Sequence, residues 1–234
     1  MIVSPAAIRG RMRTALSAAF KRTALKRARA EAWQTYTALQ EKLTLRTKAT
    51  ASSNRLARFA YNVKNAGLPR PVRYLEIGSF EGASLAYIYT LLNGDVRITA
   101  IDPFQDYSEL PGLKLASIEE VFTANVRAIG ADKAVRLLKG RSIDHLPKLI
   151  DAGESFDLIF IDGSHAMLDV MVDAVLAWRL LAPSGLMIFD DYLYSARQGG
   201  RLYRPKPAID AFIGMMAGEL DVIDVAAQVF VRRK

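Results

Sequence analysis

The sequence of 234 residues predicts an α/β protein built on a doubly wound sheet of mainly parallel strands. After residue 71, short apolar runs alternate with helical stretches, which indicates repeated βαβ units. The run at 158–161 (Leu-Ile-Phe-Ile) shows no polar alternation, as is typical of parallel strands covered on both faces. In such sheets ligands bind beyond the carboxyl ends of the strands, and polar residues follow the expected strands here.

Composition and charge limit the class of protein. Apolar residues make up 51% of the chain, and no stretch has the roughly 18 apolar residues of a membrane span. The chain has no cysteine, which excludes disulfides, thiol nucleophiles and thiolate metal sites and fits a reducing compartment. We therefore expect a cytoplasmic protein. Any metal must be bound by oxygen or by the two histidines, His145 and His165.

Residues 1–65 are expected to form a basic helical extension, followed by the main domain at 66–234. Residues 1–70 hold 15 Lys/Arg against 2 acidic residues, a balance of +13, whereas the remainder holds 17 against 22, a balance of −5. Apolar residues recur at spacings of three or four, which favours amphipathic helix; they are Ile8, Met12, Leu16, Phe20, Trp33, Tyr36, Leu39 and Leu43. The extension could pack on the main domain or on a second subunit, as in a homodimer. Contact with a membrane surface, nucleic acid or an acidic substrate stays open, as does an organelle transit peptide.

The elements of the main domain follow a breaker cluster at 65–71. Strands are expected at 72–77, 96–101, 134–138, 156–161 and 186–189, with a final pair at 220–225 and 228–231. Helices are expected at 82–92, 116–129, 142–151, 165–181 and 206–217.

The turn at 76–84 (Glu-Ile-Gly-Ser-Phe-Glu-Gly-Ala-Ser) is the strongest candidate for a cofactor site. Gly78 permits a tight turn with close backbone approach, and Gly82 lets the next helix start close to the strand. The dinucleotide pattern G-x-G-x-x-G is absent, which argues against a nicotinamide oxidoreductase. Glu76 suits a ligand with an amino or sulfonium charge better than one with phosphates. The alternative is a purely structural strand-to-helix turn.

Asp102 ends the second expected strand, where a carboxylate can accept both hydroxyls of an adenosine ribose; the alternative is a loop cap. After the third strand, Arg141 and Ser142 are expected to line an adenine, with Ser142 also acting as a helix N-cap. Together these features point to S-adenosylmethionine (SAM). The expected cofactor-binding residues are Glu76, Gly78, Ser79, Gly82, Ser84, Asp102, Arg141, Ser142 and Asp162.

Over residues 71–234 the sequence resembles the class I SAM-dependent methyltransferases. The stretches at 156–165 (Phe-Asp-Leu-Ile-Phe-Ile-Asp-Gly-Ser-His) and 185–192 (Gly-Leu-Met-Ile-Phe-Asp-Asp-Tyr) are most similar to one O-methyltransferase branch. That branch includes the caffeoyl-CoA and catechol O-methyltransferases and the macrocin O-methyltransferase and cephalosporin-hydroxylase-like families. The resemblance implies a Rossmann-like seven-stranded sheet of order 3-2-1-4-5-7-6 with the seventh strand antiparallel. It says nothing about residues 1–60.

Three carboxylates should meet at one edge of the cofactor cleft, because Asp162 follows the fourth strand and Asp190 and Asp191 follow the fifth. Such a cluster needs a positive charge, and a hard cation such as Mg²⁺ prefers oxygen ligands. The resemblance implies that Asp162, Asp190 and Asp191 are metal ligands. The alternative is that Asp162 contacts the SAM amino group and one of the others makes a loop hydrogen bond.

His165 lies three positions after Asp162, where the catechol type has a catalytic lysine. Imidazole can take a hydroxyl proton at neutral pH, so His165 and Asp162 are the expected catalytic residues. The alternative for His165 is a helix cap or a positioning role. His145 is expected to be a surface or capping residue. A loop at 192–206 carries aromatic and basic residues around Gly199 and Gly200, which suggests either a substrate loop or an ordinary solvated loop.

The expected function is metal-assisted O-methylation of a small-molecule hydroxyl, on a sugar, phenol or natural product. An RNA-modifying methyltransferase that uses the basic segment is the second hypothesis. The absence of an Asn/Asp-Pro-Pro-aromatic motif after the fourth strand argues against methylation of base nitrogens. A non-catalytic SAM-binding or membrane-associated protein is the third.

Overall fold

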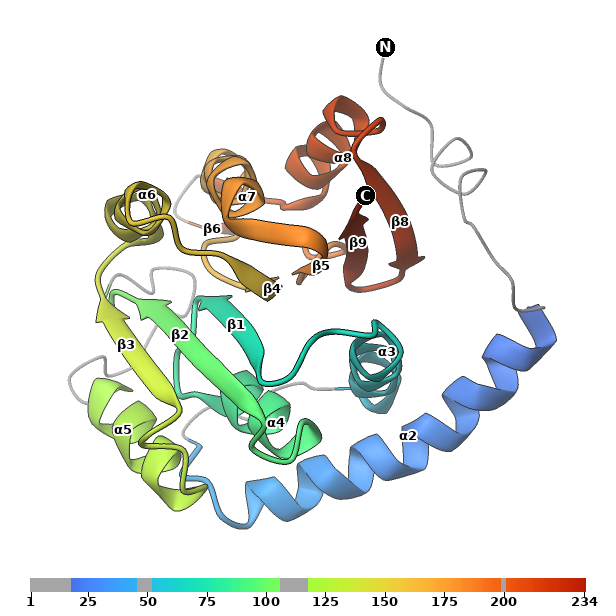
Figure 1. The fold of residues 1–234 in the computed structure, drawn as a ribbon, viewed down its shortest axis with the longest axis vertical. Helices are drawn as coiled ribbons and strands as arrows, with labels where there is room; N and C mark the ends of the chain where they lie inside the picture. The colour runs from blue at the N-terminus through green and yellow to red at the C-terminus, as the bar shows by residue number, and fades with distance from the viewer. Residues whose placement is uncertain (1–17, 46–51, 106–117, 199–200) are drawn as a thin grey trace.

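A seven-stranded sheet of order β3-β2-β1-β4-β5-β9-β8 forms the centre of the computed structural model, which describes residues 18–45, 52–105, 118–198 and 201–234 (Figure 1). Strands β1 to β5 run parallel, and β9 runs antiparallel to both β5 and β8. When only the strands of this sheet are numbered in chain order, the sheet order is 3-2-1-4-5-7-6. The seventh strand, β9, is the antiparallel one. The fold that the sequence predicted is therefore confirmed.

The elements have the following bounds. The sheet contains β1 (Val72–Ile77), β2 (Val96–Asp102), β3 (Val135–Lys139), β4 (Phe156–Ile161), β5 (Leu181–Phe189), β8 (Leu220–Val225) and β9 (Val229–Arg233). A separate hairpin contains β6 (Ala196–Gln198) and β7 (Arg201–Tyr203). The helices are α2 (Ala18–Gln40), α3 (Ser53–Lys64), α4 (Ala83–Leu91), α5 (Ile118–Ala128), α6 (Ser142–Asp151), α7 (Met167–Leu180) and α8 (Lys206–Met215).

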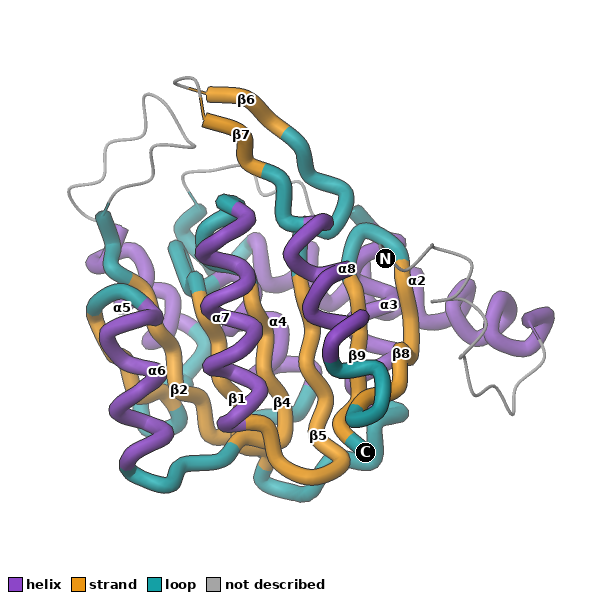
Figure 2. Tube along the Cα trace, turned by 90° about the horizontal axis from the view of Figure 1, so that it is seen from above, coloured by secondary structure: helices purple, strands orange, loops and turns teal. Residues whose placement is uncertain are grey.

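Apart from shifts of one or two residues at the ends of elements, two features differ from the sequence-based expectation. Strand β5 begins at Leu181 rather than at 186, because Leu181 already pairs with Phe156 before a shift of register. The β6–β7 hairpin was not expected, and Figure 2 shows it projecting beyond one end of the sheet. Residues 106–117 and Gly199 and Gly200 lie outside the described residues, as do Ile8, Met12 and Leu16.

Helices cover both faces of the sheet: α2 to α5 lie on one side and α6 to α8 on the other (Figure 1). Side chains alternate along a strand, so consecutive residues of β1 enter opposite cores. Tyr74 packs on the side of α3, α4 and α5, and Leu75 on the side of α6 to α8. All six residues of β4 are buried, as the apolar run at 158–161 predicted.

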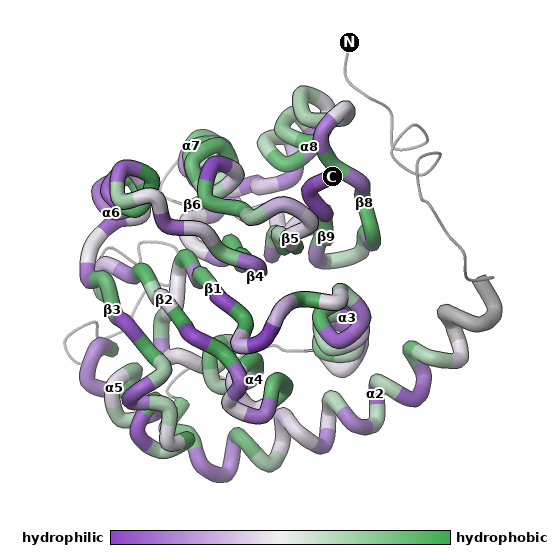
Figure 3. Tube along the Cα trace, viewed as in Figure 1, coloured by the Kyte–Doolittle hydropathy of each residue, from purple (hydrophilic) through white to green (hydrophobic). Residues whose placement is uncertain are grey.

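The N-terminal helices share the core of the sheet. The apolar face of α3, including Leu56, Phe59 and Val63, is buried in the same cluster as residues of β1, β2, β4 and β5. Helix α2 packs along α3 and α4, with alternating polar and apolar stretches (Figure 3). Its residues Tyr36 and Leu39 are buried, but Trp33 is 42% exposed because it lies off the packed face. Among the described residues, none of the helices is long and apolar enough to cross a bilayer.

Candidate active site

The glycine turn after β1 is fixed by a close approach of two backbone segments. Gly78 has φ +86°, and its amide donates to the carbonyl of Ile101 at 2.9 Å. A Cβ at Gly78 would lie 2.2 Å from the carbonyl oxygen of Asp162, so only glycine fits there. Gly82 is the N-cap of α4 with φ +79°, and a Cβ there would lie 3.1 Å from the Phe122 ring. The predicted tight turn is therefore present.

Glu76 is a fully buried carboxyl group at the end of β1. It accepts hydrogen bonds from the Tyr74 hydroxyl at 2.6 Å and the Ser84 hydroxyl at 2.7 Å. Burial raises its pKa to about 7, although these hydrogen bonds act in the opposite direction. The neighbouring Ser79 hydroxyl is buried too, and it acts on the Glu76 carboxyl by lowering its pKa. A buried acid beside a buried hydroxyl suits a ligand that carries an amino group.

Asp102 ties the glycine turn to β2. Its carboxylate is 1% exposed and accepts from the backbone amides of Phe80 at 2.8 Å and Phe104 at 2.7 Å. These hydrogen bonds are the kind that the loop-cap alternative predicts. They also hold the Asp102 carboxylate against the glycine turn. Phe80 has φ +45°, in the left-handed region, so the hydrogen bond to Asp102 helps to hold an unfavourable backbone conformation.

The residues after β3 are arranged differently from the expectation. The N-cap of α6 is Arg141 rather than Ser142, because Arg141 has extended backbone angles and Ser142 is already helical. The Arg141 side chain is exposed and pairs with Asp144 at 3.2 Å. His145 Nε2 lies 3.0 Å from the carbonyl oxygen of Lys139, in keeping with a structural role.

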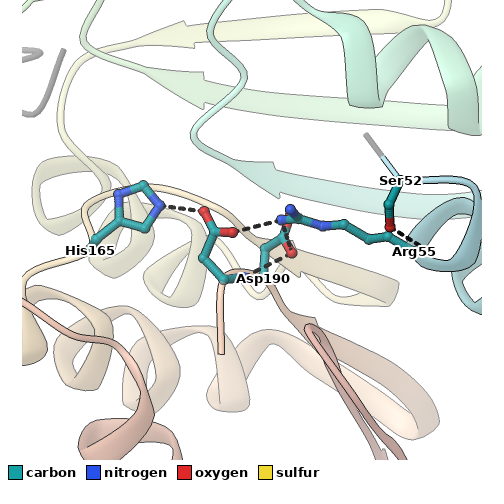
Figure 4. A network of polar contacts seen from close by, with 5 residues as sticks. Ser52, Arg55, His165 and Asp190 are labelled. Atoms are coloured by element: carbon teal, nitrogen blue, oxygen red, sulfur yellow. Dashed lines mark hydrogen bonds and ion pairs between the residues drawn. The ribbon is translucent and has the colours of Figure 1, made fainter. Parts of the chain in front are cut away.

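The loops after β4 and β5 bring His165, Asp190 and Asp191 together, and α3 adds Arg55 to them (Figure 4). His165 Nε2 lies 2.6 Å from Asp191 Oδ2. On the other side, Arg55 Nη2 lies 2.9 Å from Asp191 Oδ1 and also pairs with Asp190 Oδ1. Asp191 has φ +49°, a conformation that non-glycine residues rarely adopt and that is often found at functional sites.

Charges within the cluster shift the pKa of each group. Burial, reinforced by repulsion from Asp190 and Asp191, raises the pKa of Asp162 well above its usual value. Burial also raises the pKa of Asp190, although Arg55 opposes it. Burial would raise the pKa of Asp191 too, but His165 and Arg55 outweigh it and hold this pKa below the ordinary value. The carboxylates in turn keep the pKa of Arg55 raised despite its burial.

Donor atoms of Asp162, His165 and Asp191 all lie within 4.8 Å of one another. Two carboxylates and an imidazole are donors that suit a divalent cation. Asp190, the third expected ligand, is outside this group, and its carboxylate pairs with Arg55. The structure thus joins two of the three expected ligands with the expected base.

Sequence reasoning missed Arg55. It showed that three neighbouring carboxylates need a positive charge, but no local pattern tied that need to a residue of the N-terminal extension. The only signal was the arginine itself, three positions after Ser52.

The segment after β5 places one aromatic ring at the site. The ring of Tyr194 lies 4.6 Å from that of His165, between centroids. The side chains of Tyr192 and Lys206 bond to each other, since Lys206 Nζ donates to the Tyr192 hydroxyl at 2.8 Å. A bridge between Ala166 and Tyr203 connects the hairpin to the start of α7.

Residues 75–192 match the family model of a methyltransferase domain. A probable caffeoyl-CoA O-methyltransferase 3 of Dictyostelium discoideum is 31% identical over 122 residues, which are 51% of this chain and 43% of that protein. The O-methyltransferase hkm8 of Aspergillus hancockii is 30% identical over 139 residues, which are 59% of this chain and 50% of that protein. The chain therefore matches half or less of the length of these two relatives.

Solved structures share the fold. The O-methyltransferase of Bacillus cereus in complex with S-adenosylhomocysteine gives a TM-score of 0.60 at 17% identity, over 88% of this chain and 90% of that one. TomG of Streptomyces achromogenes in complex with SAM gives 0.57 at 20% identity, over 88% and 89%. The sequence match and the sheet order together show that the chain belongs to the methyltransferase domain family, with the architecture of class I SAM-dependent methyltransferases.

Proposed function

We propose that this protein is a SAM-dependent methyltransferase that methylates a hydroxyl oxygen of a small molecule. The observation that carries the proposal is the pair of His165 and Asp191, 2.6 Å apart beyond the carboxyl ends of β4 and β5. Methyl transfer to oxygen requires removal of the hydroxyl proton, and a histidine bonded to a carboxylate is suited to this task. The two curated relatives described above carry the name O-methyltransferase.

In this proposal the glycine turn binds the cofactor. Glu76 and Ser79 would hold the amino end of SAM, since one is a buried acid and the other a buried hydroxyl next to it. Asp102 would accept the ribose hydroxyls, and Arg141 and Ser142 would lie near the adenine. Gly78 and Gly82 would let the backbone approach the ligand closely, and Ser84 would support Glu76.

His165 would accept the hydroxyl proton, with its Nε2 lying 2.6 Å from Asp191 Oδ2. Asp191 would orient the ring and stabilise the imidazolium that forms, as carboxylates do beside catalytic histidines. The resulting oxyanion would attack the methyl group of SAM and leave S-adenosylhomocysteine. The rest of the site would contribute proximity and a preorganised field.

We also propose that Asp162 and Asp191 hold a divalent cation, with Mg²⁺ as the ion whose ligand preference fits them. Mg²⁺ keeps several waters and is usually bound through one or two carboxylates. Such an ion would make the acceptor hydroxyl more acidic. Asp190 is the weakest of the three expected ligands because Arg55 engages its carboxylate.

For residues 1–65 we propose the role of an extension that completes the domain formed by residues 66–234. Helix α3 contributes to the core of the sheet and carries Arg55 into the site.

The test measures methyl transfer from radiolabelled SAM to a panel of phenols, catechols and sugars. His165→Gln and Asp191→Asn should abolish turnover and leave SAM binding by calorimetry unchanged. His145→Gln is the matched control. His145 is the other histidine of the chain, and its ring contacts the Lys139 carbonyl rather than Asp191. Full activity in the His165→Gln protein would refute the assignment of the base. Turnover that survives EDTA unchanged would refute the cation.

A further inference from the structure

Arg55 places a positive charge among the acids of the site, and it comes from the N-terminal extension. It is the third residue of α3, and its backbone amide donates to the side chain of the N-cap Ser52 at 3.2 Å (Figure 4). One turn further along, Arg58 donates to both carboxylate oxygens of the buried Asp224 in β8, at 2.7 and 2.8 Å. The cap and the second ion pair fix the helix, so the Arg55 guanidinium is aimed into the site.

The guanidinium engages the pair of acids that follows β5. It contacts Asp190, whose side chain is 6% exposed, and Asp191, whose side chain is 25% exposed. Arginine stays charged in proteins, and its fork of donors allows it to bind two carboxylates at once. The cluster therefore already contains a permanent counter-charge for two of its three acids. A divalent cation at Asp162 and Asp191 would have to share Asp191 with this charge and would be repelled by it.

We propose that Arg55 is the resident counter-cation of the acidic cluster: it pairs with both Asp190 and Asp191 when no metal is bound and weakens the binding of a divalent cation. The inference deepens the proposed function, on which it rests for the identity of the site. It makes the metal affinity of the site a property of the N-terminal extension, which lies outside the segment that matches the family model.

The experiment measures the affinity of the full-length protein for Mn²⁺, with free Mn²⁺ followed by electron paramagnetic resonance and without SAM or acceptor. Arg55→Gln removes the charge and should bind Mn²⁺ at least about tenfold more tightly than the wild type. Arg55→Lys keeps a charge that cannot bind both carboxylates, so its affinity should rise about threefold. Arg136→Gln is the matched control, because it removes an arginine of β3 that pairs with Glu154 away from the cluster, and it should bind Mn²⁺ like the wild type.

Equal Mn²⁺ affinity in the wild type and the Arg55 variants would overturn the proposal, and so would an equal gain in Arg136→Gln, which would point to a general effect of losing one positive charge. Thermal melting of each variant shows whether it is folded. Should Arg55→Gln not fold, the Arg55→Lys protein decides the matter, and a wild-type affinity in it refutes the inference. Because no turnover is measured, failure of the proposed function would appear separately, as a lack of methyl transfer in the wild type.

Discussion

Replacement of Gly78 by alanine tests whether the glycine turn is required by a contact between two backbone segments. The new Cβ would lie 2.2 Å from the Asp162 carbonyl oxygen and 2.6 Å from the Gly163 Cα. Both are backbone atoms, so neither can rotate away as the end of a side chain would. The loop after β4 must shift, and this loop carries Asp162 and His165.

The expected cost has two parts. A non-glycine residue in the left-handed region costs about 1–2 kcal/mol, and overpacking of a well-packed site costs about 1–3 kcal/mol. Gly78→Ala should therefore lower the free energy of unfolding by about 2–5 kcal/mol. Gly130→Ala is the matched control: Gly130 has φ +69°, but a Cβ there meets nothing within 4 Å, so only the backbone part remains.

Urea unfolding followed by circular dichroism gives the free energy of unfolding of both variants, and calorimetry gives their affinity for S-adenosylhomocysteine. The difference between the two variants isolates the contact with the loop after β4. Gly78→Ala should also lose cofactor affinity, whereas Gly130→Ala should keep it. An equal loss of stability in both variants would refute the reasoning, because it would mean that the contact adds nothing.

Two further predictions concern buried polar groups. The pKa of Glu76 is raised from 4.5 to about 7, so the folded state keeps a proton that the unfolded state has released, and stability falls as pH rises through this window. At about 1.36 kcal/mol per unit Glu76 contributes a fall of about 3 kcal/mol, so the loss of stability between pH 4.5 and 7.5 in urea titrations should be smaller by about this amount in Glu76→Gln than in the wild type; parallel curves would contradict the shift. Asn125 bonds the backbone N–H and C=O of Thr44 at 2.8 and 3.0 Å and the Glu81 carbonyl at 2.7 Å, so Asn125→Ala should cost about 2–4 kcal/mol of unfolding free energy. A cost below about 1 kcal/mol would show that this link between the extension and the glycine turn is weak.

Local patterns explain why much of the fold could be predicted. The apolar run at 158–161 indicated a strand covered on both faces, and all six residues of β4 are buried. The spacing of Gly78 and Gly82 after a strand indicated a tight turn, and both have positive φ. The extended β5 and the β6–β7 hairpin were missed, because a bulge and a short strand pair leave no clear periodic pattern.

The sequence alone determined the doubly wound sheet, the glycine turn and the meeting of residues from the ends of β4 and β5, because each depends on local conformation or on the shared direction of parallel strands. Only the tertiary structure decided how the acids are neutralised. Arg55 and Asp191 are 136 positions apart, and they meet because α3 docks through its apolar face and Arg58. The same docking gives Asp190, an expected metal ligand, an arginine as its partner. Contacts between distant segments depend on packing, and no spacing in the sequence records them.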